Sequence, residues 1–66
     1  MEAEWKQRVR DEEIELRDRL EKLGAFITSF AWPAVPEDEQ YRLRKQFDLM
    51  CDYRQVLLDR IRHDFQ

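Results

Sequence analysis

The sequence is poor in the residues that build catalytic and metal sites, with one glycine, one cysteine and one histidine in 66 residues. A single glycine excludes a glycine-rich phosphate loop. Cys51 and His63 are too few to hold a transition metal, and Cys51 has no partner for an intramolecular disulfide. Ser29, the one serine, has no base near it in the sequence. We therefore expect no catalytic residue, no metal site and no cofactor, in a protein that is not an enzyme.

Long apolar runs and an excess of positive charge are also missing. No run approaches the ~20 apolar residues of a membrane span, and Met1 is followed by Glu2 and Glu4 rather than by an apolar leader. The net charge of −3 and the pI near 5.1 argue against a dedicated nucleic-acid binder. We expect a cytoplasmic protein without a membrane partner; a small anionic ligand, which needs only a few cations, stays compatible.

Charged residues make up 41% of the chain, and the apolar residues among them recur at helical spacing. The spacing predicts a first helix over about residues 3–29 and a second over about residues 36–63, where Pro36 and three acids suit a helix start. The apolar face of the first helix comprises Trp5, Val9, Leu16, Leu20, Leu23, Ile27 and Phe30. The apolar face of the second comprises Leu43, Phe47, Met50, Leu57, Leu58 and Ile61.

Residues 30–35 form the connector, because Pro33 and Pro36 hold the residues before them in extended conformations. A short connector between helices of similar length predicts an antiparallel hairpin, with Phe30 and Trp32 folded back over its end. We therefore predict an all-α fold with a single helical hairpin domain over residues 1–66. A chain this small buries little apolar surface, so the hairpins are expected to assemble into a homo-oligomeric helical bundle.

Two charged residues interrupt the apolar faces. Arg54 lies in the middle of the second face and Glu12 within the first, and the hairpin register places them opposite each other. One interpretation is an ion pair that fixes register and partner. The other is that Glu12 holds Arg54 so that its guanidinium meets a phosphate or a base edge.

A row of polar side chains with a spacing of seven runs beside the second apolar face: Gln46, Tyr53 and Arg60. The row is either a polar border or an edge that contacts a ligand. An antiparallel hairpin brings Trp5 and Arg8 close to the end of this row. Aromatic rings that stack on bases and guanidinium groups that bind phosphate are typical of nucleotide sites.

The spacing along both helices resembles the small hairpin domain shared by phage anti-CBASS and anti-Thoeris proteins. In the first helix the similar positions are Glu4, Trp5, Arg8, Val9, Glu12, Leu16, Leu20, Leu23, Phe26 and Ile27. In the second they are Pro36, Glu39, Gln40, Leu43, Gln46, Met50, Tyr53, Leu57, Arg60 and Ile61.

The resemblance implies a phage counter-defence sponge in the cytoplasm of the infected bacterial host. Such proteins sequester cyclic nucleotide second messengers without catalysis, and they assemble as homo-oligomers, possibly hexamers, with ligand pockets between protomers. The chain carries the hairpin without the additional domain of the anti-Thoeris members. The resemblance therefore favours cyclic di- and trinucleotides over signals of the cyclic ADP-ribose type.

The residues and the resemblance together predict a ligand site. We expect Arg8, Arg54 and Arg60 to bind phosphates, Trp5 and Tyr53 to stack on bases, Gln46 to contact a base edge, and Glu12 to orient Arg54 or to accept from a base amine. Two alternatives stay open. The first is an RNA-binding helical hairpin, and the second is an adaptor that binds a protein through exposed apolar residues, namely Ile14, Trp32, Tyr41 and Val56.

Overall fold

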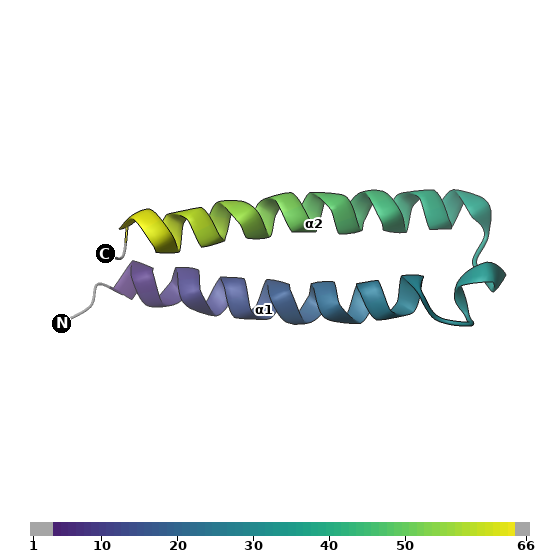
Figure 1. The fold of residues 1–66 in the computed structure, drawn as a ribbon, viewed down its shortest axis with the longest axis horizontal. Coiled ribbons are helices and arrows are strands. Elements are labelled where there is room, and N and C mark those ends of the chain that lie inside the picture. Colours follow the sequence, from purple (N-terminus) through teal and green to yellow (C-terminus); the bar gives the residue numbers. More distant parts are fainter. Residues whose placement is uncertain (1–3, 65–66) are drawn as a thin grey trace.

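The computed structural model describes residues 4–64 and shows two long helices joined by a tight turn. Helix α1 spans Glu4–Ile27, the short 3-10 helix η1 spans Trp32–Ala34, and helix α2 spans Glu37–Asp64. The helices lie side by side and run in opposite directions, so the start of α1 lies beside the end of α2, far from the turn (Figure 1). The predicted all-helical hairpin is confirmed, whereas its assembly with other copies stays a prediction.

Helix α1 ends at Ile27, two residues before the expected end near Ser29. The Thr28 hydroxyl donates to the carbonyl of Gly24 at 3.0 Å, and the Ser29 hydroxyl donates to the carbonyl of Phe26 at 2.7 Å. In a continuing helix these backbone carbonyls would accept hydrogen bonds from N–H groups of the next turn. Here the two hydroxyl groups donate to them. The chain then leaves the helix before either proline is reached.

Trp32 covers the turn end of the hairpin. Its side chain is buried, and its ring meets the ring of Phe26 edge to face with centroids 5.9 Å apart. The Gln40 amide fixes the turn to α2 by donating to the carbonyls of Trp32 at 2.9 Å and Val35 at 3.1 Å. Phe30 was expected to fold back as well, and this is wrong: its side chain is fully exposed, since the indole already covers the end.

The core is a single seam between the two helices. Alternating steps of four and three residues from Val9 to Ile27, and from Leu43 to Ile61, keep one stripe of each helix against the other. The most buried apolar residues of this seam are Val9, Leu16, Leu20 and Leu57, with Phe47, Met50 and Ile61 packed against them. The core is one side chain wide, so every position along the stripe contributes to the pairing.

Gly24 faces α2 within the last turns of α1. A Cβ atom at this position would lie 3.4 Å from Cε2 of the Phe47 ring, which is an ordinary van der Waals contact. The fold therefore has room for a methyl group where the chain carries glycine. Glycine in a helix interior lowers stability relative to alanine because its unfolded backbone has more conformations to lose.

We predict that Gly24→Ala raises the free energy of unfolding by ~0.5–1 kcal/mol, because alanine restricts the unfolded chain and its methyl group contacts Phe47. In a domain of this size the melting temperature should rise by several degrees. The matched control is Ala25→Gly at the exposed neighbouring position, which should lower it. A destabilised Gly24→Ala variant, measured at the same protein concentration, would show that the Phe47 ring does not tolerate the methyl group.

Candidate ligand-binding face

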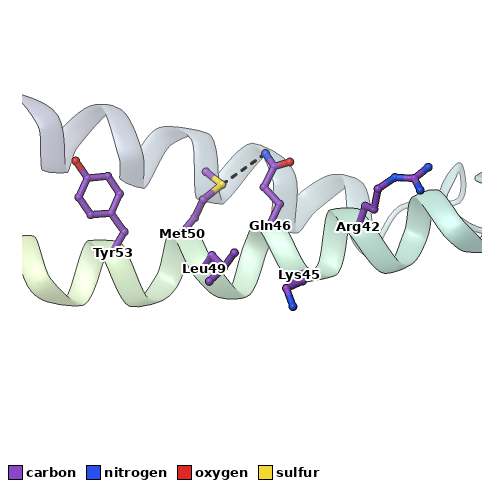
Figure 2. Close-up of a pocket in the computed structure, with 6 residues that line it drawn as sticks. All are labelled: Arg42, Lys45, Gln46, Leu49, Met50 and Tyr53. Carbon is purple, nitrogen blue, oxygen red and sulfur yellow. Dashed lines mark hydrogen bonds between the residues drawn. The ribbon is translucent and has the colours of Figure 1, made fainter.

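A shallow hollow of about 420 Å³ runs along one side of α2. Its lining combines apolar surface with an amide, a phenol and two cations, in the residues Arg42, Lys45, Gln46, Leu49, Met50 and Tyr53. The side chains of Gln46, Met50 and Tyr53 extend from α2 toward α1, while Lys45 points away from it (Figure 2). The hollow therefore lies on the side of the hairpin where the predicted polar row borders the seam.

The polar row is available for contacts with a ligand. The Gln46 amide nitrogen reaches only the Met50 sulfur, at 3.8 Å, which is a weak interaction. The Tyr53 side chain is 45% exposed. Arg60 is exposed, and among the described residues its guanidinium forms no ion pair. A base edge, a ring face and a phosphate could each find a matching group along this row.

The register of the hairpin brings a second row, from α1, to the same side. A residue that directly precedes a seam residue is rotated by about 100° from the seam. When two helices pack antiparallel, the residues that precede the seam in both helices face the same side of the pair. Trp5, Glu12 and Arg19 occupy such positions on α1, at the same spacing of seven. Residues that directly follow a seam residue face the opposite side. Gly24 and Arg44 are two of them, and they line one hollow there.

Six of the seven predicted site residues therefore share one side of the hairpin: Trp5, Arg8, Glu12, Gln46, Tyr53 and Arg60. We call this side the ligand face, and it also includes Arg19. Arg19 was not predicted from the sequence, although its distance of seven from Glu12 was a usable signal. Arg19 is exposed and, within residues 4–64, forms no ion pair.

The predicted pairing of Glu12 with Arg54 is wrong, because Arg54 pairs with Glu13. Arg54 Nε donates to Glu13 Oε1 at 3.2 Å, while Glu12 lies outside the seam and is exposed. The Glu13 side chain is only 8% exposed and that of Arg54 is 35% exposed. Arg54 therefore forms an ion pair across the seam, as one interpretation predicted, but its partner is Glu13 and not Glu12.

The error has a geometric cause. Seven residues separate Val9 from Leu16, and this interval divides into steps of three and four in either order. Continuing the alternation back from Ile27 through Leu20 and Leu16 requires a step of three next, which selects Glu13. Glu12 is then free to face the side on which Tyr53 lies.

The two predicted site residues in the first turns of α1 have local partners. Arg8 forms an exposed ion pair with Glu4 at 2.6 Å. Trp5 is 44% exposed rather than part of the apolar seam, and the ammonium group of Lys6 lies 5.8 Å from its ring centroid. The indole keeps an accessible surface on the ligand face.

The cations along α2 differ in their surroundings. Arg42 donates to Glu39 at 2.9 Å and to Asp38 at 3.3 Å, and these hydrogen bonds and charges raise the pKa of Arg42. Its charge is therefore balanced locally by the acids that begin the helix. No such acid contacts Arg60 in the part of the chain that the structure describes, so Arg60 is the better candidate for a phosphate.

Residues 4–64 show neither a metal site nor a membrane span. No group of three or more histidine, cysteine or acidic side chains is placed to hold a metal ion. Neither helix contains a stretch long and apolar enough to cross a lipid bilayer.

Comparison with known proteins gives one match. A family model described as Sequestin matches residues 3–63. No curated protein and no solved structure matches the chain.

The pairing of Arg54 with Glu13 predicts a specific pattern of stabilities. Arg54→Ala should lower the free energy of unfolding by ~1–3 kcal/mol, because it leaves the buried Glu13 carboxylate without its partner. Replacing both residues by leucine should recover most of this loss, since apolar side chains of similar size fit the seam.

A double-mutant cycle identifies the partner. Arg54→Ala combined with Glu13→Ala should show a coupling energy, whereas its combination with Glu12→Ala should be additive. Both cycles use urea unfolding at one protein concentration. Coupling to Glu12 instead of Glu13 would overturn the pairing described above.

Proposed function

The chain belongs to the Sequestin family, and on this premise we propose that it is a phage counter-defence sponge that binds and sequesters cyclic nucleotide immune signals. Cyclic di- and trinucleotides are the proposed ligands, held without catalysis in the cytoplasm of the infected host. The observation that carries this proposal is the family match, because it extends over both helices and the turn and the family name itself indicates sequestration.

The ligand face supports the proposal through its chemistry. Trp5 and Tyr53 offer half-exposed rings on which bases stack, and Gln46 offers an amide that can donate and accept at a base edge. Glu12 is exposed on the same side and can accept from a base amine. Arg19 and Arg60 supply guanidinium groups for phosphates.

The proposed roles of two other arginines change with the structure. Arg54 is held in the seam by Glu13, and Arg8 is paired with Glu4, so neither is as accessible to a phosphate as Arg60. On the ligand face, Arg19 and Arg60 are the two guanidinium groups without an ion pair among the described residues, and they match the two phosphates of a cyclic dinucleotide. The open shape of the hollow supports a pocket completed by another copy of the chain, as in a homo-oligomeric sponge.

One observation favours a second candidate, an adaptor that binds a protein. Ile14, Tyr41 and Val56 are large apolar side chains that stay more than half exposed. Trp32 was expected to belong to this set, but it is buried at the turn. The RNA-binding alternative gains no comparable support, since acids alternate with the basic residues along both helices.

A thermal-shift screen tests the proposal. The purified protein is mixed with cyclic dinucleotides, cyclic trinucleotides, cyclic ADP-ribose compounds and the matching linear dinucleotides. A ligand at 100 times its Kd should stabilise the fold by about 2.7 kcal/mol, which raises the melting temperature by several degrees. We expect the shift with cyclic di- or trinucleotides, and the bound ligand should be recovered intact by chromatography.

Each other outcome has a distinct meaning. A shift with cyclic ADP-ribose compounds alone would keep the sponge and replace the proposed ligand. A shift with linear and cyclic forms alike, or cleavage of the ligand, would contradict sequestration of a cyclic signal. A flat response to the whole panel would favour the adaptor, to be sought by its protein partner.

Arg60→Ala should abolish nucleotide binding while the oligomer survives, because Arg60 supplies an exposed guanidinium beside Tyr53 and Gln46 that forms no ion pair among the described residues. The matched control is Arg17→Ala, which removes the same charge from an exposed position on the opposite side of the hairpin. Isothermal titration measures affinity, and light scattering measures mass. Equal loss of affinity in both variants would indicate a general charge effect, and loss of mass in Arg60→Ala would make this residue structural.

A further inference from the structure

Helix α2 carries a second stripe in addition to the one in the seam. Its residues follow the same alternating steps of three and four, rotated by about 100° from the core. Leu49, Tyr53 and Val56 form its centre, and their side chains are 58%, 45% and 55% exposed. Three exposed apolar residues in register along one helix are the pattern of a helix that packs against a further helix.

The stripe is symmetric about the level of Cys51. Its positions are Glu39, Arg42, Gln46, Leu49, Tyr53, Val56, Arg60 and His63. Two copies of α2 packed antiparallel along this stripe would place Leu49 opposite Tyr53 of the second copy and Gln46 opposite Val56 of the second copy. The hollow lined by Gln46, Leu49 and Tyr53 in Figure 2 would then lie between the two copies.

Charge selects the antiparallel direction. The first turn of α2 is acidic, with Glu37, Asp38 and Glu39, and its last turn contains Arg62 and His63. A parallel pair would bring like charges together at both ends of the stripe. An antiparallel pair brings Glu39 level with His63 of the second copy, close to its Arg60.

We infer that this stripe of α2, from Glu39 to His63, is a self-association seam on which a second copy of the chain packs antiparallel about a twofold axis level with Cys51. The seam is ~36 Å long at 1.5 Å per residue. Arg60 lies beside Arg42 of the second copy, and the charge of Arg42 is balanced by its ion pairs with Asp38 and Glu39 of its own helix. Cys51 itself points away from the stripe and is not bridged across the axis.

The first test compares two equally exposed apolar positions. Leu49→Lys places a charge at the centre of the stripe, whereas Ile14→Lys places one on α1, away from it; the parent side chains are 58% and 51% exposed. Sedimentation equilibrium should show a dimer or a larger even assembly for the unsubstituted chain and for Ile14→Lys. In Leu49→Lys the association should be weakened at least tenfold, which shifts the protein toward monomer. Circular dichroism at matched concentration checks that both variants remain helical.

The second test fixes the direction of packing. Glu39→Lys should weaken association because it places a cation near Arg60 and His63 of the second copy, and the double variant Glu39→Lys with Arg60→Glu should recover it. Glu37→Lys is the control, since it changes the same helix turn off the stripe. A fully monomeric parent protein, an intact assembly in Leu49→Lys, or equal effects of the two lysine substitutions at 37 and 39 would overturn the seam. None of these outcomes depends on nucleotide binding, so the proposed function is tested separately.

Discussion

The hairpin depends on one constraint, namely that its core is a single seam with one side chain per layer. The register of such a seam is set by the layer that cannot accept a different neighbour. In this hairpin that layer is the ion pair between Glu13 and Arg54. A carboxylate that is nearly buried must find its partner, whereas the apolar layers on either side would accept neighbours of similar size. The ion pair therefore contributes specificity to a core whose stability comes from residues such as Leu16 and Leu57. This register also decides which residues of α1 lie on the same side as the polar row of α2.

Much of the architecture could be predicted from the sequence because it rests on periodicity. The alternating apolar steps define two helices, and two prolines in a short connector define the turn. The wrong predictions concern positions where the periodicity allows two registers and positions in the turn, where no periodicity applies. Between Val9 and Leu16 the spacing admits Glu12 as readily as Glu13, and only the longer alternation decides. Phe30 and Trp32 are equally apolar, and which of them covers the turn depends on the backbone path that Ser29 and Thr28 set when they end α1.

The candidate site was more accessible to sequence reasoning than the ion pair. A spacing of seven keeps Gln46, Tyr53 and Arg60 on one side of a helix whatever the partner helix does. The contribution of α1 was harder to predict, because it requires the register of the hairpin. Once Glu13 is placed in the seam, Glu12 and Arg19 move to the same side as the α2 row. A shift of one residue in the core therefore changes the composition of the surface. Because Glu13 pairs with Arg54, Glu12 lies on the ligand face, where its carboxylate can accept a hydrogen bond from a ligand.

The proposed ligand face and the proposed self-association seam share Gln46, Tyr53 and Arg60, which links binding to assembly. A ligand that contacted only one copy would compete with the second copy for these side chains and would drive the assembly apart. A ligand that contacts both copies stabilises the assembly, and the assembly in turn strengthens ligand binding. The two effects have the same free energy, because the coupling is reciprocal. A sponge benefits from the second arrangement, because the pocket is complete before the signal arrives and little ordering remains to oppose capture. Arg60 of one copy and the locally paired Arg42 of the other lie together at each end of the seam, where a phosphate would meet both chains at once.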